Sequence, residues 1–571
     1  MPTPLKVSDK FYPLLLILII LMSFGNSLCN GFVYDDGYLI VQNSFLRDFG
    51  NIKTILFSDV TVATSIGKAS GYYRPLSMLY LMAGYHAWGL NTFFWHLGSL
   101  VLHAFNVLLV FRILRKMGCV RNLAFLTSLF FAVHPIHVEA VTPVYNVMGV
   151  LAAFFSLASF LMFLKSGALK NKRYSAASWL LFLCAVFTKE ETLILPVIFL
   201  LYDYYFYAKF KIRALSPRIK TYALFFVPAV LYLAMRIVFI EKGAALGLWH
   251  FPLSFNVPPP AQNNLLFFAF QILRLYGKYI YLLFFPLNLN AYHVIVPLQN
   301  ILDVNALSPA GIFIALLGAA FYLRLKQPLV SFFIWFFFLS SLLVSNIFPI
   351  GGIFAERFMY LPSLSFCFLI GFCFIHYFPK RLMTICAAGL VIFYSLLTIT
   401  RNYVWRTDVL LWKDTVSKSP YSSMPHLNLA VAYMDTQKYG QALNEFEAAL
   451  RFPSPKVAQI HNAIGKIYAR KGMYQKALEE FNKALSLRGD LVESYYDAGL
   501  TYFYLNDFEN AQELFQKAIS LNEKYPWSYY GLGLVYEKRG NKQLSLQMFE
   551  KALVLDEKFS PAKEAIERVR K

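Results

Sequence analysis

Long apolar stretches recur along roughly the first 400 residues of the chain, and charged, alanine-rich sequence replaces them after that point. Apolar runs of about 20 residues are long enough to cross a bilayer as α-helices. Short clusters of lysine and arginine separate many of these runs, as in the cytoplasmic turns of membrane proteins. With the N-terminus inside, the pattern predicts about eleven transmembrane helices, at residues 11–29, 93–111, 122–140, 147–164, 176–188, 192–207, 221–239, 307–323, 328–347, 355–377 and 383–400.

For two apolar segments, length alone does not establish whether they are transmembrane helices. Residues 265–287 are long enough to span, but they carry Arg274 and Lys278. Cationic side chains are costly inside hydrocarbon, so we expect an amphipathic helix on the outer surface or a re-entrant piece. Residues 11–24 also look like the apolar core of a signal peptide, but no clear small-residue cleavage site follows, and we expect a retained first helix. An odd number of crossings then leaves the C-terminus outside the cytoplasm.

The C-terminal part has an internal period of 34 or 35 residues, marked by Ala442, Ala477, Ala511 and Ser545. A phenylalanine follows each of these positions by four residues and an alanine follows by seven. This is the spacing of the tetratricopeptide helix-turn-helix repeat. We therefore predict an all-α chain with a polytopic membrane domain over 1–402, a linker over 403–422, an α-solenoid of four repeats over 423–559 and a capping helix over 560–571.

Composition agrees with a membrane protein. Of the 571 residues, 58% are hydrophobic and only 15% are charged. The net charge of +21 comes from scattered clusters and not from one continuous face, so we expect no nucleic-acid partner. The six cysteines form no CxxC pair, which argues against a zinc site or a disulfide framework. The sequence also lacks a P-loop, a dinucleotide-binding glycine motif, HExxH and Gly-x-Ser-x-Gly, so soluble nucleotide chemistry is not expected.

Charged side chains are scarce in the membrane part, so each one is a candidate functional residue. Asp35 and Asp36 directly follow the first span. Two carboxylates at a membrane surface can supply a general base for a hydroxyl group, since a neighbouring charge and partial burial raise one pKa toward neutrality. A divalent cation held by the pair is an alternative, and so is a simple solvated turn.

Three further motifs carry charge on the predicted outer side. The spacing of His134, His137 and Glu139 allows a metal site, but a proline after His134 interrupts the helix and favours structural or substrate-orienting hydrogen bonds. Lys189, in "FTKEETLILP", lies at a short turn that either forms local salt bridges or holds a phosphate-bearing donor. Arg357, beside Glu356 at the end of a span, suits bidentate contact with phosphate, and an internal ion pair is the alternative.

Seven stretches in order give the chain a family resemblance. Together they resemble the multi-pass C-type glycosyltransferases, and most closely the transmembrane and tetratricopeptide repeat O-mannosyltransferases with their bacterial relatives. The resemblance covers essentially the whole chain. The matching stretches are "FVYDDGYLIVQN", "YYRPLSMLY", "FWHLGSLVLHAFNVLLV", "HPIHVEAV", "TKEETLILPV", "LVSNIFPIGGIFAERFMYLPS" and "RNYVWRTDVLLWKDTVSKSP".

The resemblance implies transfer of a sugar, mannose in the named family, from a polyprenyl-phosphate donor in the membrane lipid to a hydroxyl of an extracytoplasmic protein or glycan. It implies that Asp35 or Asp36 is the catalytic carboxylate and the other its partner. It implies no certain cofactor, although a divalent cation is possible, and the lipid-phosphate sugar is the donor substrate. It implies that the residues contacting substrate are Arg74, His137, Glu139, Lys189, Glu356 and Arg357.

One stretch departs from the family pattern. Relatives often carry a basic and acidic pair after the His-Pro motif, whereas this chain reads "TPVYNVMGVL", in which Asn146 is the main polar side chain. If that pair contacts donor or acceptor, this protein has a changed specificity or has lost some activity.

Two other functions compete with the glycosyltransferase. One is a non-catalytic scaffold whose membrane part anchors the repeats. The other is an envelope-polysaccharide ligase or polymerase. For each of the three we expect a multi-pass protein of a bacterial inner membrane with periplasmic repeats, and the alternative is the endoplasmic reticulum membrane with luminal repeats.

Overall fold

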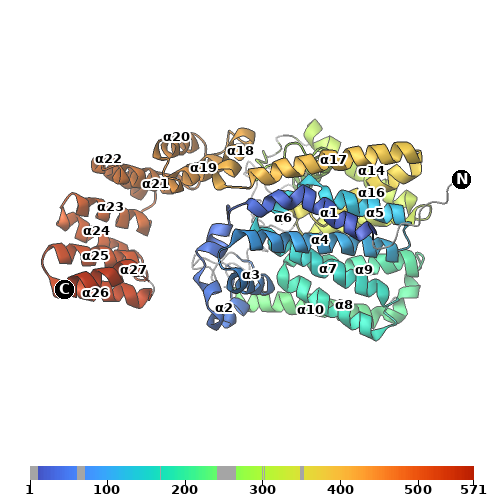
Figure 1. Cartoon of the computed structure of the whole chain (residues 1–571), viewed down its shortest axis with the longest axis horizontal. Helices are drawn as coiled ribbons and strands as arrows, with labels where there is room; N and C mark the ends of the chain where they lie inside the picture. The colour runs from blue at the N-terminus through green and yellow to red at the C-terminus, as the bar shows by residue number, and fades with distance from the viewer. Residues whose placement is uncertain are drawn as a thin grey trace. The chain divides into compact units, whose positions relative to one another are not determined.

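The computed structural model describes residues 11–60, 71–167, 169–240, 265–296, 298, 300, 302–347, 353–557 and 559–570. Helices are the only regular secondary structure in these ranges, which confirms the all-α prediction. They form two compact units, Met1–Asp414 and Thr415–Lys571 (Figure 1). The boundary falls within α18 (Asp408–Lys418), a helix that occupies much of the predicted linker, 403–422.

Seven helical segments of the described residues are long and apolar enough to cross a membrane. The bend of an eighth, α5 (Arg121–Val133) continued by Pro135–Val141, measures 51°. Proline disfavours a helical conformation in the residue before it, and His134 is accordingly extended, so the His-Pro sequence causes the bend. The seven segments contain α1 (Phe11–Phe24), α4 (Thr92–Lys116), α7 (Val147–Lys165), α10 (Ile219–Phe239), α13 (Leu265–Phe284), α14 (Val304–Leu323) and α17 (Lys380–Val404).

The other predicted crossings are shorter helices, so each of the eleven predicted segments lies on helical residues, although fewer pass the length criterion. The segment predicted to lie on the surface or to re-enter is the single 20-residue helix α13, and its position in the membrane stays a prediction. It packs closely on α14, since a Cβ at Gly277 would lie 2.7 Å from Pro309. The shorter helices are α8 (Lys172–Thr188), α9 (Leu195–Tyr202), α15 (Pro328–Leu342) and α16 (Ser363–Tyr377).

Buried polar side chains fix α4 relative to its neighbours. α4 runs alongside α1 and α7 (Figure 1), and His103 and Asn106 lie on its buried face. The Nδ1 atom of His103 is 2.7 Å from the Tyr360 hydroxyl, and Asn106 donates from Nδ2 to the Val150 carbonyl at 2.9 Å. Because an unpaired buried polar group costs free energy, the Asn106 bond sets the register of α4 against α7, whose first turn lines the site described below, and the His103 bond ties α4 to the segment before α16.

The second unit contains four helix pairs with the predicted period. Small residues are needed where the helices of a pair approach: a Cβ at Gly465 would lie 2.6 Å from the ring of Phe481, and one at Gly533 would lie 2.5 Å from Phe549. The pairs are α19 (Ser423–Asp435) with α20 (Tyr439–Leu450), α21 (Val457–Arg470) with α22 (Tyr474–Leu487), α23 (Val492–Tyr504) with α24 (Phe508–Leu521), and α25 (Pro526–Lys538) with α26 (Lys542–Leu555).

The last helix, α27 (Ser560–Arg570), lies where the capping helix was predicted. It buries Ala562, Ala565, Ile566 and Val569 against the fourth pair and leaves charged residues on its other face. A polar outer face of this kind ends a solenoid without exposing its apolar interior.

Candidate active site

The segment after α1 that carries Asp35 and Asp36, called the acidic loop here, turns sharply at Tyr34, which has a left-handed backbone with a φ of 57°. Asp36 is fully buried: its Oδ2 accepts the Val33 N–H at 3.0 Å and its Oδ1 accepts the Tyr145 N–H at 2.6 Å. These bonds shape the loop and tie it to the segment before α7. Asp35 is the member of the pair that lines a cavity.

The acidic loop is also held by residues near the end of the membrane unit. The Gly31 N–H donates to the Arg406 carbonyl at 3.1 Å, and the Tyr34 N–H donates to Asp408 Oδ1 at 2.8 Å. The Tyr34 ring meets Trp412 edge-on, with the ring centroids 5.1 Å apart. The stretch "RNYVWRTDVLLW" therefore supports the acidic loop from a distant part of the sequence.

The cavity beside Asp35 has a volume of about 180 Å³. Five regions contribute to it: the acidic loop, the segment before α3 (Pro75–Trp88), the first turn of α7, the turn at Lys189 and the turn at Arg357. One carboxylate thus shares the cavity with three cationic side chains. The polar side chains that line it are Asp35, Tyr38, Tyr72, Arg74, Tyr145, Asn146, Lys189 and Arg357.

Each of the three cations is held by its own carboxylate. Arg74 binds Glu190 through two hydrogen bonds, one of them from Nε to Oε2 at 2.9 Å. The Nζ atom of Lys189 lies 2.8 Å from Glu191 Oε2.

The third pair joins two distant turns. Glu139 accepts the backbone N–H of Arg357 at 3.0 Å and also pairs with its guanidinium group. Glu139 is only 1% exposed, so it meets Arg357 from the protein side. None of the three glutamates lines the cavity, whereas all three cations do. Each pair is neutral as a whole, but it turns its positive end toward the cavity.

The surroundings shift the pKa of two site carboxyl groups in opposite directions. Burial raises the pKa of Asp35 to about 6, and the positive charge of Arg357 limits the rise. Burial alone would raise the pKa of Glu190, but the ion pair with Arg74 outweighs it and lowers that pKa to about 2. Asp35 can therefore gain and lose a proton near neutral pH, while Glu190 stays a fixed negative charge behind Arg74.

Asp36 has the most strongly buried carboxyl group of the loop. Burial raises its pKa to about 7, although the N–H groups of Val33 and Tyr145 favour the ionised form. Its oxygens face these backbone donors and not the cavity. We therefore assign the two neighbouring aspartates different tasks: Asp36 orders the loop, and Asp35 faces the space where a substrate can bind.

Two residues predicted to contact substrate lie outside the cavity lining. His137 is fully buried, and its Nε2 is 2.7 Å from the Ser363 hydroxyl. Glu356 is fully buried as well; it accepts the Asn290 N–H and lies 2.8 Å from His293 Nε2. Both residues join segments that are far apart in the sequence, and their contact with substrate stays a prediction.

The His-x-x-His-x-Glu spacing does not converge on one point. His134 contacts the Leu283 carbonyl through Nε2 at 3.0 Å, while His137 contacts Ser363 and Glu139 pairs with Arg357. Among the described residues, no three His, Cys, Asp or Glu side chains are gathered as metal ligands. This geometry favours the structural interpretation of the motif.

Sequence reasoning missed several members of the site. Glu190 lies in the turn for which we expected either local salt bridges or a bound phosphate. Lys189 does pair with Glu191 there, but Glu190 binds Arg74, 116 positions away. No local pattern signals that partner. Asn146 donates from Nδ2 to the Glu139 carbonyl at 2.6 Å and lines the cavity. The uncharged stretch "TPVYNVMGVL" singles out Asn146 in the sequence, but it does not predict this hydrogen bond.

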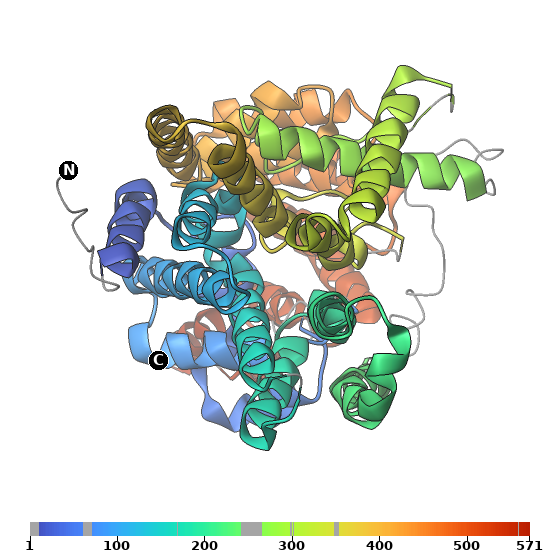
Figure 2. The ribbon, with the colours of Figure 1, turned by 90° about the vertical axis from the view of Figure 1, so that its right-hand side faces the viewer.

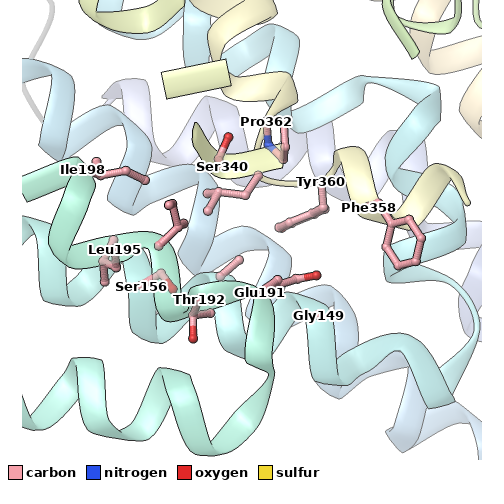
Figure 3. A pocket seen from close by; sticks show the side chains of 13 residues that line it. Gly149, Ser156, Glu191, Thr192, Leu195, Ile198, Ser340, Phe358, Tyr360 and Pro362 are labelled. Atoms are coloured by element: carbon pink, nitrogen blue, oxygen red, sulfur yellow. The ribbon is translucent and has the colours of Figure 1, made fainter. Parts of the chain in front are cut away.

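A smaller, mainly apolar hollow of about 20 Å³ adjoins the cavity, and the two share Gly149 and Phe358 in their linings. Figure 3 shows Leu195, Ile198 and Pro362 around it, with the polar side chain of Glu191 toward one end. Its walls come from α7, α9 with the turn before it, α15 and residues 358–362. A mainly apolar hollow thus lies next to the polar cavity inside the membrane unit.

Comparison with known proteins agrees with both units. Tetratricopeptide-repeat family models match residues 456–524 and 496–561. Human protein O-mannosyl-transferase TMTC1 is 27% identical over 498 residues, which cover 78% of this chain and 55% of the relative. The chain is similar to protein O-mannosyl-transferases. Human protein O-mannosyl-transferase TMTC3 is 25% identical and matches 84% of this chain and 55% of its own length.

The similarity extends beyond vertebrate proteins. Protein O-mannosyl-transferase F38B6.6 of Caenorhabditis elegans is 26% identical over 430 residues, which cover 73% of this chain and 59% of the relative. The chain therefore spans somewhat more than half the length of these O-mannosyl-transferases. The matches reach well beyond the repeats into the membrane unit, so the resemblance recognised from the sequence motifs is confirmed, and with it a multi-pass membrane protein.

Proposed function

We propose that the protein is a glycosyltransferase that moves a sugar, with mannose as the first candidate, from a polyprenyl-phosphate donor to a hydroxyl group of an extracytoplasmic protein or glycan. The observation that carries the proposal is the cavity in which Asp35 faces the positive ends of three ion pairs. A general base and an anion-stabilising wall are the two parts that this reaction needs. Similarity to O-mannosyl-transferases supports the same chemistry.

In the proposed step, the oxygen of the acceptor hydroxyl attacks the anomeric carbon of the sugar. The bond between that carbon and the phosphate oxygen breaks, and the phosphate leaves with the electron pair. The carboxylate of Asp35 takes the proton of the hydroxyl group. Arg74, Lys189 and Arg357 stabilise the charge that develops on the departing phosphate, and their glutamate partners hold them in place before the reaction begins.

The apolar hollow, at about 20 Å³, holds little more than a water molecule, so it would have to widen to take the lipid part of such a donor. It adjoins the cavity at Gly149 and Phe358, so a phosphate among the cations would leave the first isoprenoid units among Ile194, Leu195 and Ile198. Burial of that apolar surface would orient the donor and keep water away from the reacting bond.

The side chains that line the cavity are not suited to binding a divalent cation. Asp35 is the one carboxylate among the described residues that line it, and three positive side chains surround the same space. Mg²⁺ and Ca²⁺ prefer several oxygen ligands. We therefore propose transfer without a bound metal. Treatment with EDTA should leave the rate unchanged within twofold, and loss of activity that Mg²⁺ restores would contradict this part of the proposal.

We assign the repeats the task of binding the acceptor or a partner protein, since a solenoid offers an extended surface for a peptide. For the reaction we propose the periplasmic face of a bacterial inner membrane, and the lumen of the endoplasmic reticulum is the alternative. Either location puts a lipid-borne donor and a water-soluble acceptor on the same side.

The test compares wild type with Asp35→Asn and Asp36→Asn in membranes at equal expression. Radiolabelled sugar is supplied on a panel of polyprenyl-phosphate donors, and label is followed into protein and glycan. We expect Asp35→Asn to abolish transfer without lowering the unfolding temperature. Asp36→Asn should lower that temperature, because a buried acceptor of two backbone bonds is altered.

The outcomes separate the competing functions. Label in protein supports the O-mannosyl-transferase-like reaction, and label in a glycan polymer supports a ligase or polymerase. Full activity of Asp35→Asn would overturn the assignment of the base. No transfer by wild type from any donor in the panel would favour the scaffold function.

A further inference from the structure

A second hollow, of about 500 Å³, lies at the other end of α7 from the proposed catalytic cavity. Gly149 lines the cavity and Lys165 lines the hollow, and 16 residues of helix correspond to about 24 Å. That distance approaches the hydrocarbon thickness of a bilayer, about 30 Å. Figure 2 shows the side of the membrane unit at which α1 begins. Tyr12 of α1 is a neighbour of Arg121, which lines the hollow: the guanidinium carbon lies 5.8 Å from the centroid of the Tyr12 ring.

The lining of this hollow is strongly cationic. Five of its seven residues are basic, and no carboxylate is among the described residues that line it. Between residues 60 and 189 the sequence has a single acidic residue, Glu139, which pairs with Arg357 at the catalytic end. The lining residues are Phe111, Arg112, Arg115, Lys116, Arg121, Leu161 and Lys165.

Membrane topology alone does not account for this arrangement. The positive-inside rule explains why basic residues occur on one side, but it requires no convergence around a common space. Here the end of α4, the start of α5 and the end of α7 bring their basic side chains to one hollow. Like charges that share a hollow repel one another, and an anion between them lowers that repulsion.

The start of α5 adds donors for the same anion. The residue before this 13-residue helix is Val120, which has no side chain able to cap the first N–H groups. Uncapped N–H groups and the positive end of the helix dipole favour phosphate oxygens. Arg121, the first residue of α5, lines the hollow, so these donors lie at its edge.

The rest of the lining is apolar. Phe111 and Leu161 line the hollow beside the cations, and Val120 next to it leaves 59% of its surface exposed. A free phosphate ion would use the charges and not the apolar wall, whereas a phospholipid would use both. Basic pockets between transmembrane helices on the cytoplasmic side are suited to anionic lipid headgroups.

We propose that this hollow binds the phosphate headgroup of an anionic phospholipid from the cytoplasmic leaflet. The site is separate from the catalytic cavity and does not depend on the proposed function. Arg112, Lys116 and Lys165 are exposed side chains whose main contribution is charge. Their replacement should remove lipid binding and leave the fold intact.

The test uses the full chain, purified in detergent and delipidated. Native mass spectrometry counts bound phosphatidylglycerol and, separately, bound phosphatidylcholine over a titration. The test variant is R112Q/K116Q/K165Q. The matched control is K170Q/K172Q/R173Q, which removes the same charge from three exposed residues of the neighbouring turn that do not line the hollow.

We expect wild type and the control variant to bind phosphatidylglycerol at least tenfold more tightly than phosphatidylcholine. The test variant should lose at least tenfold in phosphatidylglycerol affinity. Equal losses in both variants would show a non-specific basic surface, and no lipid preference in wild type would remove the site; either result overturns the proposal. Displacement of the lipid by millimolar inorganic phosphate would overturn the assignment to a lipid.

Discussion

The repeats and the cavity beside Asp35 are assembled in opposite ways. In the repeats, the contacts that matter join neighbouring helices: Phe515 fills the space against Gly499 on one side and Gly531 on the other. In the cavity, Arg74 pairs with a glutamate 116 positions away, and Glu139 accepts a hydrogen bond from a residue 218 positions away. The repeats therefore depend on local sequence, and the cavity depends on the whole membrane unit.

This difference predicts different consequences of damage. A solenoid has a stability that is close to a sum over repeats and their interfaces, so a defect in one repeat should stay near it. The cavity is small, and its charged groups act as a set, so the loss of one group should change the chemistry and leave most of the fold in place. The predictions below test this contrast, from the largest expected effect to the smallest.

Of the substitutions compared below, Arg357→Gln should have the largest effect, a loss of about 10²–10³-fold in sugar transfer, because it removes a cation that we propose stabilises the departing phosphate. Glu139→Gln should lose less, about tenfold, since Arg357 remains but is held less firmly. The double variant should be no slower than Arg357→Gln alone, because Glu139 acts through Arg357.

Transfer assays at equal expression measure these three rates, and Arg213→Gln, an exposed residue outside the cavity, is the matched control. Losses that multiply in the double variant would contradict the view that the two residues act as one unit.

Phe515→Ala should destabilise the repeats by about 3–5 kcal/mol, as expected for a fully buried phenylalanine. Amide hydrogen exchange followed by mass spectrometry should accelerate across α23, α24 and α25 and stay unchanged in the segments around the cavity. Leu487→Ala, at a side chain that is 58% exposed, is the control and should change little. Faster exchange around Asp35 would show that the two units are not independent.

The pH dependence of transfer should report the environment of Asp35. A carboxyl with the ordinary pKa of 3.8 keeps its basic form well below pH 5, whereas burial raises the pKa of Asp35 to about 6. The basic form is therefore lost as the pH falls through 6, and transfer at pH 5 should be about one tenth of that at pH 7. A return to pH 7 should restore the rate, which separates protonation from unfolding. A flat profile between pH 5 and 7 would exclude Asp35 as the titrating base.

Ser545→Ala should have the smallest effect. Ser545 occupies the position at which the other three repeats have alanine, and its buried hydroxyl makes no hydrogen bond in the described structure. Removing that group should stabilise the fourth repeat by about 1 kcal/mol or less. Thermal unfolding followed by circular dichroism tests this, with Ser486→Ala, at an exposed serine, as the control. A clear loss of stability would mean that the hydroxyl has a partner.

The same contrast explains what could be predicted from the sequence. The repeats were predictable because their spacing, small residues and phenylalanines are local signals, and the apolar runs were predictable for the same reason. The choice between Asp35 and Asp36 was not, because no periodicity applies to a loop. It depends on the left-handed turn at Tyr34 and on the N–H of Tyr145, more than 100 positions away.

Motif spacing also left open which partners the fold brings close to a residue. His137 and Glu356 lie in stretches that resemble the family, yet they bind Ser363 and His293 inside the packed unit. Glu139, in the same motif as His137, does reach the site, through its ion pair with Arg357 and through the hydrogen bond from Asn146 to its carbonyl. A motif position identifies a region of the fold, and only tertiary contacts decide which of its side chains faces the substrate.

The bonds from the acidic loop to Arg406 and Asp408 bear on how the protein is made. The loop leaves the ribosome early, while the residues that hold it are synthesised only after almost the whole membrane unit. A nascent chain that stops before Asp408 would have Asp35 but not the support that positions it. The loop that carries Asp35 is therefore fully supported only at the end of membrane-unit synthesis, so a partly made chain lacks the complete cavity.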